Sequence, residues 1–317
     1  MMGGSNIPEG VWPVLLTPFD EHGELDAGAL DGMLDFYVTT GVAGIFSAAL
    51  SGEVDCLTID EICRMNRRLV ARADGRLPIV SGANIGRNLR EQCDAMRRVH
   101  DTGVDAVIVL LSFLPEGQDL VGQLLELADM TPFPLGLYEC PEPEHRLLSP
   151  EAVGTLAKTG RFFFMKETSR DAAVHLEKVA ATRGTALKVF QGSLGPLPAS
   201  LRGGCPGFCG LVANVCPELV RAYCDLSDWD TPAADALFQS ISELQGVMTA
   251  RGYPSSAKYI LRKRGVKMGF TSRAASGGSF AAEDRAKIDR FLATFEFGAP
   301  GIGEQETEEM FTAAAGG

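Results

Sequence analysis

The segment Arg161-Phe162-Phe163-Phe164-Met165-Lys166-Glu167-Thr168 is a short apolar run that ends on an amine. A run of this length, followed at once by polar residues, predicts a buried β-strand whose last side chain, that of Lys166, emerges at the carboxyl end. An amine held against apolar side chains loses hydration of its charged form, so its pKa falls and it becomes a nucleophile toward carbonyl carbons. A lysine that extends to the surface is the alternative for this segment alone. Lys188 also lies in an apolar run, but at its start, and barrel enzymes place residues that serve stability there.

Similar apolar runs recur along the chain, with helical stretches between them. They lie near residues 11–17, 43–48, 78–82, 105–111, 133–138, 162–166, 187–191 and 207–212. Helix start signals introduce the stretches between them, namely Thr58 with Glu61, Asn88 with Glu91, and Ser149 before a proline. Eight strands that alternate with helices predict an α/β fold of the (β/α)8 barrel type, also called a TIM barrel. A doubly wound parallel sheet is the alternative fold.

The strand pattern stops near residue 214, and the pattern after it is helical. The predicted helices cover residues 217–226, 232–250, 255–264 and 282–296. We therefore expect a catalytic barrel over residues 7–214 and a C-terminal helical domain over residues 215–297. Residues 298–317 are acidic and rich in Gly and Ala, and we expect a mobile tail there.

Composition narrows the class of protein. With 317 residues and 45% hydrophobic content the chain can bury a full core, and its net charge of −12 argues against nucleic acid or an anionic membrane surface as partner. No apolar run approaches the roughly 20 residues that span a bilayer. The first residues lack the basic and apolar parts of a secretory signal, so we expect a cytoplasmic protein with eight reduced cysteines. The four histidines are scattered, and we expect neither a metal site nor a cofactor.

The residues after the strands of a β/α barrel meet at one catalytic face. The second predicted strand is followed by the turn Leu50-Ser51-Gly52, whose backbone N–H groups and Ser51 hydroxyl can hold a carboxylate. The fifth strand ends at Tyr138. The seventh ends at Gly192, where the absence of a Cβ permits close approach of a ligand, and the eighth ends around Cys209.

An amine nucleophile, a phenol and an anion cradle are the minimal apparatus for 2-oxo acid chemistry. Lys166 would attack the ketone and form an iminium ion, a cation that accepts electrons during cleavage or formation of a neighbouring bond. Tyr138 would move the protons, with Glu139 or a water molecule as the alternative. An aromatic core residue is the other interpretation of Tyr138.

These segments resemble the dihydrodipicolinate synthase/N-acetylneuraminate lyase family over residues 7–297. The matching motifs, in chain order, are Gly10–Phe19, Ala49–Glu53, Tyr138–Pro141, Met165–Glu167 and Val212–Val215. The resemblance implies that Lys166 is the Schiff-base lysine and Tyr138 the acid/base. It also implies that Ser51 and Gly52 bind the substrate carboxylate, and that the protein is a homo-oligomer, either a dimer or a tetramer.

Three departures from the family pattern bear on the substrate. Leu50 stands where the family turn has a hydroxyl residue, and Phe113 stands where the synthases have a phenol. Pro143 replaces the arginine that follows the family's Tyr-Asn-x-Pro motif, with His145 and Arg146 nearby as open substitutes. These changes disfavour lysine biosynthesis.

The sequence thus favours a Schiff-base-forming lyase that acts on a pyruvate-type 2-oxo acid. The reaction would be aldol cleavage or addition, dehydration or deamination. Leu50, Leu111 and Phe113 indicate a partly apolar partner. The residues after Gly192 lack the acidic groups of the sialate lyases, which disfavours sialate cleavage. The alternatives are a 2-oxo acid sensor that has lost turnover and a true dihydrodipicolinate synthase. A metal-dependent barrel hydrolase would need a cluster of His and Asp residues at the strand ends, which this sequence lacks.

Overall fold

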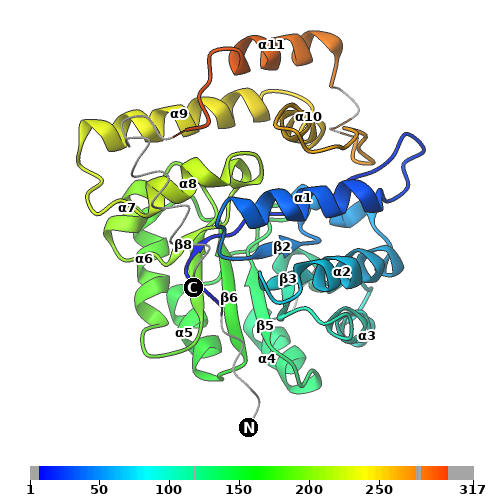
Figure 1. The fold of residues 1–317 in the computed structure, drawn as a ribbon. Helices are drawn as coiled ribbons and strands as arrows, with labels where there is room; N and C mark the ends of the chain where they lie inside the picture. Colours follow the sequence, from blue (N-terminus) through cyan, green and yellow to red (C-terminus); the bar gives the residue numbers. More distant parts are fainter. Residues whose placement is uncertain (1–6, 117–118, 276, 278–279, 299–317) are drawn as a thin grey trace.

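The computed structural model describes residues 7–298 except 117–118, 276 and 278–279 (Figure 1). Its centre is a parallel sheet in the order β1-β8-β7-β6-β5-β4-β3-β2. The strands are β1 (Gly10–Val11), β2 (Ile45–Ser47), β3 (Ile79–Gly82), β4 (Ala106–Leu110), β5 (Leu135–Tyr138), β6 (Phe162–Glu167), β7 (Lys188–Gln191) and β8 (Gly207–Phe208). The expected tail over residues 298–317 lies outside the described residues, apart from Gly298.

A bridge between the two ends of this sheet closes it into a barrel. Val14 pairs with Phe46 of β2 in parallel, the Leu15 N–H donates to the Phe46 carbonyl at 2.8 Å, and the Phe46 N–H donates to the Pro13 carbonyl at 3.0 Å. The predicted (β/α)8 barrel is confirmed. The first strand is shorter than residues 11–17 because Pro13 has no N–H with which to continue the ladder.

Helices follow the strands on the outside of the barrel. They are α1 (Ala27–Thr39), α2 (Ile59–Ala73), α3 (Leu89–His100), α4 (Leu120–Met130), α5 (Pro150–Lys158), α6 (Ala172–Ala181), α7 (Leu197–Arg202) and α8 (Pro217–Cys224). The predicted start signals are confirmed. The Thr58 side chain accepts from the Glu61 N–H in a full capping box, and Asn88 and Ser149 cap α3 and α5 through their side chains.

Single turns of 3₁₀ helix follow three of the strands, before the next barrel helix begins. They are η1 (Leu50–Gly52), η2 (Val54–Cys56), η3 (Leu111–Phe113) and η4 (Leu211–Asn214). The eighth strand is shorter than residues 207–212 because the chain turns into η4 directly after Gly210.

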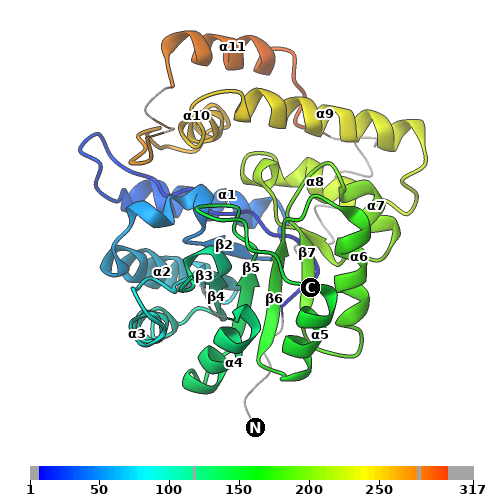
Figure 2. The same cartoon turned by 180° about the vertical axis from the view of Figure 1, so that it is seen from behind.

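Three further helices, α9 (Pro232–Thr249), α10 (Ser255–Lys263) and α11 (Ala282–Leu292), lie together across one end of the barrel, as Figures 1 and 2 both show. Helix α8 packs against β1 and β8, in the ring of barrel helices. We therefore propose a domain boundary after α8 rather than at residues 214/215.

Aromatic rings fill the barrel interior beneath the carboxyl ends of the strands. The Phe164 ring lies 5.1 Å from that of Trp12, 4.8 Å from that of Phe190 and 5.9 Å from that of Phe46, between centroids. All four side chains are buried. Because side chains alternate along a strand, the residue two positions after Phe164 on β6 faces the same interior, and that residue is Lys166.

Candidate active site

Lys166 stands on an apolar floor near the end of β6. Its side chain is 3% exposed, and its Nζ lies 4.4 Å from the centroid of the Tyr138 ring and 5.9 Å from that of Phe46. Burial lowers the pKa of the Lys166 amine from its ordinary value of 10.5. The predicted buried strand with an amine near its carboxyl end is confirmed, and the surface alternative for Lys166 is excluded.

Tyr138 is the neighbour of Lys166 across the sheet. The two residues are in register between β5 and β6. Burial raises the pKa of the Tyr138 phenol well above 10.0, so the free phenol is protonated at neutral pH. It can donate a proton, and to lose one it requires a cation nearby.

Glu139 faces away from this site, toward the helical layer. Both of its carboxylate oxygens accept from the Lys178 Nζ of α6, at 2.7 and 2.9 Å, and the same amine donates to Glu167 at 2.9 Å. All three side chains are buried. Glu139 and Glu167 directly follow Tyr138 and Lys166, so this ion cluster fixes the strand ends that carry the phenol and the amine. Glu139 therefore lacks the position needed to replace Tyr138 in proton transfer.

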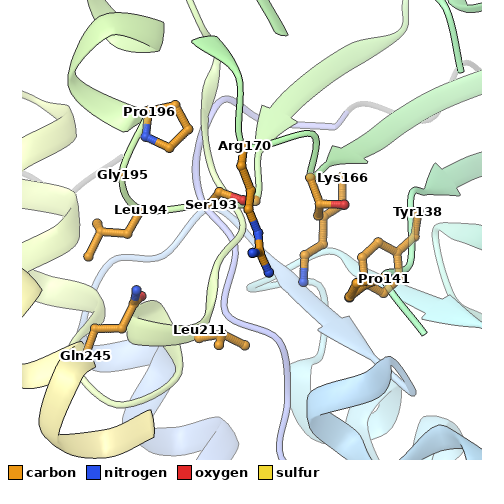
Figure 3. A pocket seen from close by; sticks show the side chains of 12 residues that line it. Tyr138, Pro141, Lys166, Arg170, Ser193, Leu194, Gly195, Pro196, Leu211 and Gln245 are labelled. Carbon is orange, nitrogen blue, oxygen red and sulfur yellow. The ribbon is translucent and has the colours of Figure 1, made fainter. Parts of the chain in front are cut away.

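A cavity of about 600 Å³ opens in front of Lys166 (Figure 3). Its lining combines apolar side chains with hydroxyl, amide and guanidinium groups. The lining residues are Tyr138, Pro141, Lys166, Thr168, Arg170, Gly192, Ser193, Leu194, Gly195, Pro196, Leu211 and Gln245. Of the seven residues expected at the site, Lys166, Tyr138 and Gly192 line this cavity, whereas Leu50, Ser51, Gly52 and Cys209 do not.

The turn Leu50–Gly52 and the residue after it contact the C-terminal helical region through hydrogen bonds. The phenol of Tyr253 is hydrogen-bonded to Ser51 and Asn214, which opposes the burial that raises its pKa to about 12. Glu53, next along the chain, accepts from the Lys258 Nζ at 2.5 Å. A carboxylate-binding role for Ser51 and Gly52 stays a prediction.

The chain approaches itself closely at Gly192. A Cβ there would lie 2.5 Å from the Glu167 carbonyl oxygen and 3.3 Å from the Lys166 Cε. The close approach of β6 is a sufficient reason for a glycine at position 192, and no bound ligand is needed to explain it. Cys209 is fully buried. Burial raises the pKa of its thiol to about 11, and the nearby positive charge of Lys166 opposes this rise.

The two open substitutes for the family arginine are both hydrogen-bonded to other groups of the protein. The Nη1 of Arg146 donates to the Leu114 carbonyl at 2.8 Å and to the Leu111 carbonyl at 3.3 Å. The Nε2 of His145 lies 2.9 Å from the Thr168 hydroxyl. Neither residue lines the cavity.

Sequence reasoning missed the polar side chains that line the cavity opposite Lys166. Arg170 lies in the loop that follows β6, four positions after Lys166, and such loops build the catalytic face of a barrel, so a signal was present. Gln245 lies on α9. No local pattern links it to the barrel, because only the folding of the C-terminal helices over the strand ends brings it there.

The lowered pKa of Lys166 makes a prediction for pH dependence. Attack on a carbonyl needs the neutral amine, whose fraction increases as pH rises through the pKa. Because that pKa is lowered, the ascending limb of the pH profile is expected to have its midpoint below 10.5. The check is kcat/KM for deuterium exchange at C3 of pyruvate, measured over pH. A midpoint at or above 10.5 would contradict a desolvated Lys166 as nucleophile.

Within the described ranges, no three His, Cys, Asp or Glu side chains are grouped so as to hold a metal ion. Among the helices in the same ranges, none has the length and apolar content to cross a membrane.

A β/α barrel with a desolvated lysine beside a phenol at its strand ends defines an enzyme of the class I aldolase type, a lyase that acts on a small molecule. The model of the dihydrodipicolinate synthetase family matches residues 7–293, and the chain belongs to that family.

The relatives are homologues of moderate identity. The 4-hydroxy-tetrahydrodipicolinate synthase of Methanosphaerula palustris is 28% identical over 270 residues, which is 82% of this chain and 91% of the relative. The enzyme of the same name from Nitrosococcus oceani is 26% identical over 260 residues, covering 81% of this chain and 88% of the relative.

Solved structures share the fold. A prophage protein of Escherichia coli K12 in complex with pyruvate has a TM-score of 0.81 at 21% identity, covering 92% of this chain and 99% of that one. Dihydrodipicolinate synthase from Thermotoga maritima has a TM-score of 0.80 at 18% identity, with 92% and 99% covered.

Proposed function

We propose that the protein is a Schiff-base lyase that makes or breaks a carbon–carbon bond at C3 of pyruvate. The observation that carries the proposal is the Lys166 amine, which is buried and held 4.4 Å from the Tyr138 ring at the edge of a cavity. The pyruvate-bound relative from Escherichia coli supports a 2-oxo acid as the substrate.

The steps follow from the chemistry of the two side chains. The Lys166 amine adds to C2 of pyruvate, and loss of water gives the iminium ion. The iminium cation acidifies the C3 protons, and removal of one gives an enamine. The enamine carbon bonds to an aldehyde carbon while the aldehyde oxygen takes a proton. Water then hydrolyses the imine, which releases a 4-hydroxy-2-oxo acid and the free amine. Cleavage is the reverse sequence.

Tyr138 is proposed to carry the protons. Its phenol stays protonated in the free protein because burial raises its pKa. The iminium ion formed at Lys166 supplies the neighbouring cation that makes loss of the phenolic proton feasible. Among the described residues, no carboxylate lines the cavity to compete for this role.

Deuterium exchange at C3 of pyruvate tests the proposal without knowledge of the aldehyde. The protein in D₂O is expected to erase the C3 proton signal of pyruvate by nuclear magnetic resonance, because each enamine that is reprotonated takes up solvent deuterium. A binding protein that has lost turnover would leave the signal intact, and so would a protein in which Lys166 forms no imine. That outcome would exclude the proposed function.

A second candidate is the activity named for the curated relatives, 4-hydroxy-tetrahydrodipicolinate synthase. Condensation of pyruvate with aspartate semialdehyde is the check. We expect little product, because the side chains of Leu50, Phe113 and Pro143 cannot donate hydrogen bonds. The family pattern has side-chain donors at these three positions, and a polar substrate depends on such donors. A kcat/KM of about 10⁴ M⁻¹s⁻¹ or more, within the ordinary enzyme range, would establish aspartate semialdehyde as the aldehyde partner.

A further inference from the structure

Arg170 is a cation in the lining of the cavity that contains Lys166. Figure 3 shows both side chains extending into that cavity, with Gln245 of α9 also reaching it. The side chain of Arg170 is exposed. Within the described part of the chain, no carboxylate forms an ion pair with its guanidinium, whereas Arg68, Arg72 and Arg273 pair with Asp31, Asp35 and Glu61.

The backbone at Arg170 is strained. Its φ is 66°, in the left-handed region that residues with a Cβ rarely adopt. Glycine would adopt this conformation freely. A non-glycine residue held in such a conformation beside a candidate active site points to a role for its side chain.

The remainder of the cavity suits an anionic ligand with an apolar body. Pro141, Leu194, Pro196 and Leu211 supply apolar wall, and the described lining includes no aspartate or glutamate although the chain has 41 acidic residues. An anion placed here meets no like charge, and an ammonium group would find no carboxylate to pair with.

We propose that Arg170 selects the aldehyde partner by binding an anionic group at its far end, while the apolar wall packs its carbon chain. Guanidinium binds carboxylate and phosphate through two parallel hydrogen bonds, so either anion fits this chemistry. The substrate class is a 4-hydroxy-2-oxo acid with a terminal anion, assembled from pyruvate and an anionic aldehyde that carries no amine. This inference rests on the proposed function, and it adds the terminal anion to the partly apolar partner expected from the sequence.

Four aldehydes, each offered with pyruvate, test the inference. Succinic semialdehyde has a terminal carboxylate, glyceraldehyde 3-phosphate a terminal phosphate, butanal no charge, and aspartate semialdehyde both a carboxylate and an ammonium. The wild type is expected to prefer one of the first two over butanal, and to use aspartate semialdehyde poorly. The better of the first two identifies the anion.

Two variants isolate the guanidinium. In Arg170→Gln, the ratio of kcat/KM for the preferred anionic aldehyde to that for butanal is expected to fall roughly 10- to 100-fold, the scale of one charge-assisted hydrogen-bonded pair. Arg170→Lys is expected to recover part of the ratio, because an ammonium keeps the charge and loses the bidentate geometry. Arg87→Gln is the matched control, since Arg87 is an exposed arginine that pairs with Glu91 at 2.7 Å and does not line the cavity.

The outcomes separate this inference from the function on which it rests. No deuterium exchange into pyruvate by the wild type removes the proposed function and the inference together. Exchange with an unchanged ratio in Arg170→Gln overturns the assignment of Arg170 alone. Exchange with none of the four aldehydes taken up, or with butanal preferred, also overturns it.

Discussion

Replacing Lys166 by alanine is expected to remove turnover almost completely, by on the order of 10⁶, the scale of losses when a covalent nucleophile is deleted. Without the amine no iminium forms, and the cavity retains no group that can act as an electron sink. Because the Lys166 side chain is 3% exposed, alanine also leaves a void, so Lys166→Met is the volume-matched second variant. Both are measured by deuterium exchange into pyruvate, with the thermal midpoint as the check on folding.

Lys188→Ala is the matched control. Lys188 begins β7 at the opposite end of the barrel strands and pairs with Glu9 at 3.4 Å, with its side chain 31% exposed. Its replacement is expected to leave exchange within a small factor of the wild type. Exchange that survives in both variants of Lys166 would place the nucleophile elsewhere.

Tyr138→Phe is expected to slow turnover by about 10²–10⁴, the usual contribution of a positioned proton-transfer group. Phenylalanine keeps the ring that packs 5.6 Å from Phe46 and next to the Lys166 amine, so the apolar floor and the depressed pKa of the amine are retained. The variant should therefore still form the imine with pyruvate and fail at the proton transfers that follow. Single-turnover imine formation and steady-state exchange, measured together, separate these steps.

Tyr259→Phe removes a phenol from the C-terminal helices, where it donates to Asp289 at 2.9 Å, and serves as the control. If Tyr138→Phe exchanges deuterium into pyruvate as fast as the wild type, a water molecule rather than Tyr138 would carry the proton. Glu139 cannot take this role, because it is bound to Lys178 outside the cavity. Loss of exchange in Tyr259→Phe as large as in Tyr138→Phe would indicate a general loss of structure.

The recurring apolar runs of the sequence predicted the barrel and the position of Lys166 near the end of a buried strand. The apolar run that ends near Lys166 forms β6, and Tyr138 faces it across the sheet because both lie at the carboxyl ends of neighbouring parallel strands. β1 ends before Pro13, because proline has no N–H with which to continue the ladder. The apolar pattern of residues 11–17 does not by itself show this interruption.

The rest of the site depends on contacts between segments that are distant in the sequence. Glu139 and Glu167 bind the same amine of α6, which turns both away from the cavity. Arg146 is held by backbone carbonyls of the loop after β4, so proximity in sequence to the family arginine position was misleading. Gln245 reaches the cavity only because α9 lies over the strand ends.

Reduction of a trapped imine tests the central claim most directly. Wild-type protein incubated with pyruvate and borohydride is expected to gain the mass of one reduced three-carbon adduct per chain, and peptide mapping is expected to place it on Lys166. The Lys166→Ala variant should gain none. A full adduct on that variant, or a label that maps to Lys188, would contradict the account.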